Sequence, residues 1–147
     1  MNLIIKKFSE LSLDELYEIF RVRIAVFVVE QDCSYHELDD LDQTAYHFFY
    51  EENGKILAFL RLLYQNLPEG QVKIGRVLTM QRGQGLGLKI MQDAIQFTKQ
   101  NLNAEYIRVE AQVSARGFYE KLGFKQSSNE YKIDSIPHIE MIYQLND

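Results

Sequence analysis

The chain carries a run of apolar residues at helical spacing near its start. Positions 13, 16, 17, 20, 24 and 27 are apolar. Ser12 precedes them and Glu15 follows three residues later, a capping-box pattern in which each side chain bonds the backbone N–H of the other residue. These features predict an amphipathic helix over about 13–26. Similar spacing predicts a helix over 86–101 and a short helix over 115–122, which ends at Gly123, a residue suited to a left-handed C-cap.

Apolar and alternating runs predict strands in most of the remaining chain. These strands cover residues 3–8, 45–51, 56–64, 72–79, 106–111, 124–131 and 138–145. Asn53-Gly54 lies between two of them and is a strong hairpin signal, because both residues tolerate positive φ. No repeat or linker divides the chain, so we expect one domain over 1–147. The element order βαβββαβαββ predicts an α/β layered fold whose mixed sheet is antiparallel first and parallel around the two later helices.

A glycine-rich turn joins a predicted strand to the second predicted helix, with the sequence Gln81-Arg82-Gly83-Gln84-Gly85-Leu86-Gly87. Its glycines let the backbone approach a ligand closely, and a helix N-terminus attracts anions, so a phosphate or pyrophosphate is the expected guest. No Lys-Ser or Lys-Thr follows, as a nucleoside-triphosphate loop requires, and the G-x-G-x-G spacing differs from the dinucleotide-binding fingerprint. The turn does satisfy R-x-x-G-x-G. A purely structural tight turn is the alternative interpretation.

Composition and charge narrow the class of protein. The 147 residues are 46% hydrophobic and 25% charged, which is ordinary for a globular domain and excludes a wholly disordered chain. A net charge of −5 disfavours non-specific binding of nucleic acid. The longest apolar run, 24–29, is too short to cross a bilayer, so no membrane partner is expected. Cys33 is the single cysteine, which excludes an internal disulfide and favours a reducing, cytoplasmic location.

Several segments, in this order, resemble the GNAT superfamily of acetyl-CoA-dependent N-acetyltransferases. They are the strand KIGRVLT, the turn QRGQGLG, the helix LKIMQDAIQF, the strand YIRVEAQ and the segment ARGFYEKLGF. Within the superfamily, the segments RVRIAVFVVEQDCSYHELDDLD, IGRV and IPHIEM resemble the ElaA group. The resemblance covers residues 3–145. It implies a mixed, mostly antiparallel sheet with splayed central strands and flanking helices.

The resemblance also implies that acetyl-CoA is the co-substrate and that the glycine turn binds it. Its pyrophosphate would be held by backbone N–H groups from Arg82, Gly83, Gln84, Gly85, Leu86 and Gly87. The pantetheine arm would pair with the strand at Val77, Leu78 and Thr79, where one N–H would polarise the thioester carbonyl. Tyr119 would protonate the leaving thiolate, although an aromatic residue at this helix position is otherwise expected in the core.

The expected acceptor is a primary amine of a small molecule or peptide, which attacks the thioester directly in a ternary complex. Such an amine is mostly protonated at neutral pH, so a base or a desolvating site is needed. Glu30 and Glu110 are the candidate bases. Each has a plainer interpretation, Glu30 as a surface carboxylate and Glu110 as the partner of Arg76 or Arg108.

Four further side chains are candidates for contact with the acceptor. Arg61 and Arg76 lie in predicted strands, where they can bind a carboxylate or pair with the two glutamates just named. Arg23 lies off the apolar stripe of the first helix. His138 begins the last predicted strand, where a hydrogen-bonded structural histidine is the alternative.

The acidic stretch 37–42 lacks the pattern of a calcium-binding loop. We expect it to be solvated, with a lip that attracts a cationic amine as the alternative. The histidines at 36, 47 and 138 have no metal-ligand spacing, so no metal is expected. A non-catalytic module that binds CoA species is the alternative function, and a monomer or homodimer is the expected assembly.

Overall fold

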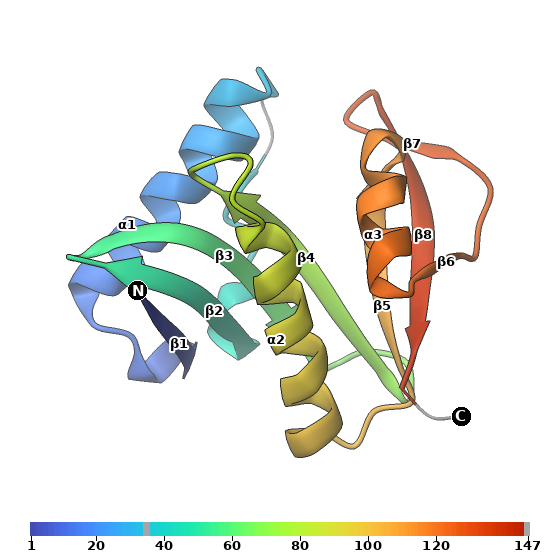
Figure 1. Ribbon diagram of the computed structural model, residues 1–147, viewed down its shortest axis with the longest axis horizontal. Coiled ribbons are helices and arrows are strands. Elements are labelled where there is room, and N and C mark those ends of the chain that lie inside the picture. The colour runs from blue at the N-terminus through green and yellow to red at the C-terminus, as the bar shows by residue number, and fades with distance from the viewer. Residues whose placement is uncertain (34–35, 146–147) are drawn as a thin grey trace.

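The computed structural model describes residues 1–33 and 36–145, which fold around a sheet of eight strands (Figure 1). The strands are β1 (Asn2–Lys7), β2 (Ala45–Glu52), β3 (Lys55–Leu63), β4 (Gln71–Thr79), β5 (Tyr106–Gln112), β6 (Lys125–Gln126), β7 (Tyr131–Ile133) and β8 (Ile136–Gln144). Their order across the sheet is β1-β2-β3-β4-β5-β8-β6, and β7 pairs with β8. Within the described residues β4 and β5 form the single parallel pair, so the sheet is mixed and mostly antiparallel, as predicted.

Two details of the sheet differ from the prediction. The segment 124–131 is not one strand, because the chain leaves the ladder after Gln126 and returns at Tyr131 as a separate strand, β7. The second parallel pair is also missing, because β8 lies between β5 and β6 and pairs antiparallel with both. The last hairpin therefore fills the position beside β5 that the prediction gave to the strand after the third helix.

Among the residues that the structure describes, three α-helices flank the sheet: α1 (Leu13–Arg23), α2 (Leu86–Asn101) and α3 (Arg116–Leu122). The capping box of α1 forms as predicted, since the Ser12 N–H donates to the Glu15 carboxylate over 2.8 Å and the Glu15 N–H donates to the Ser12 hydroxyl over 3.0 Å. Helical structure does not end near Val26. It continues as a π-helix over Ile24–Glu30, which carries the chain up to the edge of the cleft described below.

The helices cover opposite faces of the sheet. Ile19 and Val22 of α1 pack against Phe49 and Phe59, while Ile90 and Met91 of α2 belong to the larger core on the other face. The third helix packs on the same face as α2, over β5 (Figure 1). No helix in the described ranges is both long and apolar enough to cross a bilayer.

Candidate active site

The two central strands separate from each other after a short contact. β4 and β5 pair only at Gln71–Lys73 with Tyr106–Arg108, and beyond these residues the strands diverge (Figure 1). A bulge accompanies the divergence, because Arg76 and Val77 together oppose one residue of β3. The backbone of Arg76 is left-handed there, with φ at 54°, which an L-residue adopts only at a cost. The predicted splay of the central strands is therefore present, and the bulge lies a few residues beyond the last pair that joins them.

A cleft of about 490 Å³ opens between the diverging strands. Its walls come from five parts of the chain: the end of the π-helix, the loop that contains Asp39 and Leu41, β3 and β4, β5 with α3, and the β7–β8 hairpin. Polar side chains that line it are Gln31, Cys33, Asp39, Arg61, Lys73, Arg76, Glu110, Gln112, Tyr119, Asp134 and His138. The structure thus gathers Tyr119, Glu110, Arg61, Arg76 and His138, which the sequence placed in one site, around a single cavity.

Tyr119 is a largely buried residue of α3 that reaches this cleft, with 9% of its surface exposed. Its ring packs edge-on against Phe118 and Phe124, at centroid distances of 5.0 and 5.6 Å. Within residues 1–33 and 36–145 its hydroxyl has no hydrogen-bond partner. Burial raises the pKa of Tyr119 to about 12, so the phenol keeps its proton at neutral pH. A protonated hydroxyl without a partner, at the wall of a cavity, is available to donate to a ligand.

The glycine turn lies next to this region. Gly83 and Gly85 have φ of 79° and 70°, and a β-carbon at either position would meet nothing within 4 Å. Gly87 lies in the first turn of α2, where a β-carbon would come within 3.4 Å of the Phe118 ring and 3.5 Å of Thr79. The exposed turn therefore leaves open space at the helix N-terminus, where the first backbone N–H groups have no partner within the helix. This space suits an anion.

Glu110 is tightly engaged within the cleft. One of its carboxylate oxygens accepts from Lys73 Nζ over 2.5 Å, and the other accepts from the Tyr131 hydroxyl over 3.0 Å. Burial alone would raise the pKa of Glu110, but Lys73, Tyr131 and the charge of Arg108 outweigh it and lower the pKa. The principal partner is Lys73, and the predicted pairing with Arg108 is present as a longer ion pair of 3.8 Å. A carboxylate held in this way is a weak base.

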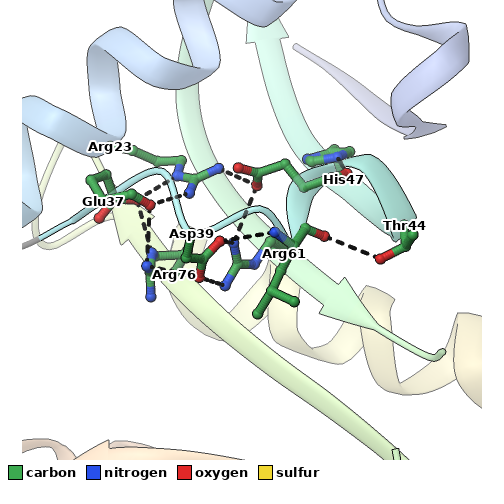
Figure 2. A network of polar contacts seen from close by, with 9 residues as sticks. Arg23, Glu37, Asp39, Thr44, His47, Arg61 and Arg76 are labelled. Carbon is green, nitrogen blue, oxygen red and sulfur yellow. Dashed lines mark hydrogen bonds and ion pairs between the residues drawn. The ribbon is translucent and has the colours of Figure 1, made fainter. Parts of the chain in front are cut away.

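A buried network of charged side chains fixes the acidic stretch 37–42 (Figure 2). Arg23 is fully buried and donates to the Glu37 and Asp42 carboxylates, over 2.6 Å in each case. Arg76 donates to Glu37 over 2.8 Å, and Arg61 donates to both oxygens of Asp39 over 2.8 and 2.9 Å. The expectation of a solvated acidic loop is therefore wrong. The carboxylates of Glu37, Asp39 and Asp42 pair with arginines of α1, β3 and β4 and hold the loop against the cleft, whereas Asp40 is exposed.

This network corrects the roles expected for the arginines. Arg23 has no exposed surface and does not line the cleft, so it has no contact to offer an acceptor in this structure. Arg61 and Arg76 do line the cleft, but their partners are Asp39, Asp42 and Glu37 and not the glutamates that we predicted. Arginines already bound to carboxylates are poor receptors for another one.

Glu30, which we expected as a candidate base, lies outside the cleft. It ends the π-helix, its side chain is exposed, and it is not one of the residues that line the cleft. Its carboxylate forms an ion pair with Arg82, in the glycine turn. Glu30 therefore tethers the turn to the end of the π-helix, and the expectation that it is a base is not supported.

Sequence reasoning missed Lys73 and Tyr131, which hold Glu110. Lys73 had a readable signal, because it is a lone cation between buried Val72 and Ile74 in a central strand. A charged residue at such a position needs a partner from the neighbouring strand. Tyr131 gave no comparable signal, because its role depends on the hairpin folding back beside β5.

Comparisons with known proteins agree with this geometry. The sequence model of the family described as "Acetyltransferase (GNAT) domain" matches residues 12–145. Protein ElaA of Escherichia coli is 34% identical over 137 residues, which cover 90% of each chain. Its crystal structure superposes with a TM-score of 0.91, covering 98% of this chain and 100% of that one at 32% identity. An acyl-CoA N-acyltransferase from Pseudomonas aeruginosa has a TM-score of 0.90 at 37% identity, covering 97% of this chain and 99% of that one.

These matches establish the class of protein, and the chain belongs to the GNAT acetyltransferase family. The fold of the family implies use of an acyl-CoA and supports acyl transfer as the activity. Within the family the chain falls in the ElaA-like group, which the matches to ElaA in sequence and in structure both confirm.

Proposed function

We propose that this protein transfers an acetyl group from acetyl-CoA to a primary amine of a small molecule or peptide, by direct attack in a ternary complex. The observation that carries the proposal is the cleft between β4 and β5, where the Tyr119 hydroxyl lies without a partner among the described residues. Both halves of such a reaction need the same cavity, because the amine and the thioester must meet there.

The cofactor side of the proposal rests on β4 and the glycine turn. The Met80 N–H donates to the Leu57 carbonyl over 2.8 Å and so points toward β3. Backbone amides alternate along a regular strand, so that of Thr79 points to the opposite, open side. We propose that the bulge at Arg76 and Val77 turns the Val77 N–H toward the same side. Leu78 faces the buried core. We propose that the two open amides pair with the pantetheine arm, that the Val77 N–H polarises the thioester carbonyl, and that the backbone of 82–87 holds the pyrophosphate.

The proposed chemistry needs no covalent intermediate. The neutral amine attacks the carbonyl carbon, a carbon–nitrogen bond forms and the carbon–sulfur bond breaks. The amine loses a proton and the leaving thiolate gains one. We propose Tyr119 as the donor to the thiolate, a role supported by its place in the cleft wall and by its hydroxyl, which has no partner among the described residues.

The test is to incubate the protein with acetyl-CoA and a panel of amines. The panel should hold alkyl amines, diamines, amino acids and peptides with free N-termini. Chromatography with mass spectrometry should quantify free CoA and acetylated acceptor, because a thiol reagent would also react with Cys33, which lines the cleft. We expect both products in equal amounts. Thermal stabilisation by acetyl-CoA without either product would indicate a non-catalytic binding module instead.

A further inference from the structure

The tautomer of His138 is set by its surroundings. Its Nδ1 atom lies 2.7 Å from the backbone carbonyl oxygen of Ile136. A carbonyl oxygen only accepts hydrogen bonds, so Nδ1 carries the proton in this contact. The neutral imidazole therefore keeps a lone pair on Nε2, and His138 is one of the residues that line the cleft. Neither of the other two histidines lines the cleft, since His47 is buried in the protein and His36 is not among the lining residues.

The ring of His138 is held in place by the strands on both sides. It pairs across the ladder with Tyr131 of β7 on one side and with Gln112 of β5 on the other. The ring stacks on that of Tyr131, with a centroid distance of 6.4 Å and an angle of 26° between the planes. The Tyr131 hydroxyl in turn donates a hydrogen bond to the Glu110 carboxylate, which accepts another from Lys73. A chain of three side chains, from Lys73 through Glu110 to Tyr131, thus orients the imidazole at the cavity wall.

The carboxylates of the same cavity are less suited to accept a proton. Both oxygens of Glu110 already accept hydrogen bonds, from Lys73 and Tyr131. Asp39 lies between Arg61 and Arg76; burial alone would raise its pKa, but the two arginines outweigh it and lower the pKa. Asp134 is exposed at the turn of the β7–β8 hairpin. These groups, the phenol of Tyr119 and the thiol of Cys33 are the titratable and charged groups that share the cleft with His138.

We propose that His138 is the general base of the acetyl transfer, and that Tyr131 and Glu110 position it. The role rests on the proposed function. In the step, the amine nitrogen bonds to the carbonyl carbon and its proton passes to Nε2 of His138. The thiolate leaves with the electrons of the carbon–sulfur bond and takes the proton of Tyr119. Solvent then removes the proton from the imidazolium and returns one to the phenolate, so that the products are the amide and free CoA.

The central variant is His138→Asn, because an asparagine amide can still donate to the Ile136 carbonyl but cannot take up a proton near neutral pH. We expect kcat/KM to fall by about 10²–10⁴-fold. The part of the acid limb that comes from the enzyme should disappear, which leaves only the slope due to protonation of the amine substrate. Acetyl-CoA affinity should stay within about twofold of the wild type. His36→Gln is the matched control and should leave the rate and the pH profile unchanged. Tyr131→Phe should lower kcat while retaining the acid limb.

A second measurement does not depend on turnover. Nitrogen-15 spectra of the imidazoles in the intact protein should show His138 with its proton on Nδ1 at neutral pH. A proton on Nε2 would overturn the role, and so would an intact acid limb with kcat/KM within about threefold of wild type in folded His138→Asn. A wild-type protein that acetylates none of the amines refutes the proposed function itself, which is a different result from an active enzyme that ignores the loss of His138.

Discussion

Arg23 and Glu37 form an ion pair inside the protein, with Nε of Arg23 donating to Oε2 of Glu37 over 2.6 Å and neither side chain more than 4% exposed. A buried guanidinium is tolerated only when it is paired and hydrogen-bonded. Arg23 satisfies this with Asp42 as a second partner and with the Glu37 carbonyl over 3.1 Å. The pair joins α1 to the loop that forms one wall of the cleft.

Replacing Arg23 with Met should therefore destabilise the fold strongly. The change keeps most of the side-chain volume but leaves two buried carboxylates with one cation fewer, which typically costs about 3–5 kcal/mol. Urea denaturation followed by circular dichroism measures the free energy of unfolding. Arg116→Met is the control, since its ion pair with Glu120 is exposed and worth about 0–1 kcal/mol. Equal small losses in both variants would contradict the importance of the buried pair.

The left-handed backbone at Arg76 allows its side chain and its main chain to be separated experimentally. Arg76→Ala removes the bonds to Glu37 and Asp39 and keeps the β-carbon at φ of 54°. Arg76→Gly removes the same bonds and also the backbone cost, which is about 1–2 kcal/mol. We expect Arg76→Gly to be the more stable of the two by about 1 kcal/mol in chemical denaturation. The reverse order would show that the bulge is not under backbone strain.

Tyr119→Phe tests the proposed acid, because it keeps the ring packed on Phe118 and Phe124 and removes only the hydroxyl. We expect kcat at saturating acetyl-CoA to fall by about 10²-fold, with little change in acetyl-CoA affinity. Tyr143→Phe is the matched control, since it removes a hydroxyl that contacts Lys99 outside the cleft. A kcat of Tyr119→Phe within about twofold of wild type excludes the acid role.

The proposed pyrophosphate site can be tested by a pair of variants that differ in charge alone. Gly85 has φ of 70° and open space for a β-carbon, and both Asn and Asp tolerate this conformation better than other residues. Acetyl-CoA at about 100 times its Kd should stabilise wild-type protein by about 2.7 kcal/mol. Thermal shift should show that Gly85→Asp loses most of this effect and that Gly85→Asn keeps more of it. Equal stabilisation of the two would argue against an anion at the turn.

His47 should make stability depend on pH. Its imidazole is buried, and burial lowers its pKa, helped by the charges of Arg23 and Arg61 and opposed by Asp42. The unfolded chain binds a proton below about pH 6.5 while the folded one does not. The free energy of unfolding should therefore fall as pH drops from about 6.5 toward the folded pKa, by at most about 1.4 kcal/mol per pH unit. His47→Gln should flatten this slope between pH 5 and 6.5, whereas exposed His36→Gln should not.

Local signals in the sequence predicted the frame of the fold. The capping box at Ser12, the hairpin at Asn53-Gly54 and the glycine turn all lie where short-range rules put them, because each depends on a few neighbouring residues. The partners of charged residues were not predictable in the same way. Arg23 and Glu37 are 14 residues apart and meet only through the path of the intervening loop.

The tautomer of His138, like the partners of the charged residues, could not be predicted from the sequence. It follows from a carbonyl two residues away, but only in the geometry of the hairpin that β7 and β8 form. The resemblance to the GNAT family therefore predicted the gap between the central strands, while the protonation and pairing of the side chains in the cavity required the folded chain.

The divergence of β4 from β5 gives this sheet two more exposed edges than its two outer strands provide. Unpaired strand edges recruit strands of other molecules, and natural proteins protect them with charges, bends and short lengths. Here the bend at Arg76 and the charges of Lys73 and Glu110 lie along the gap. An extended ligand paired with β4 would cover one of these inner edges, and the occupied molecule would then be less prone to associate with other copies through its strands.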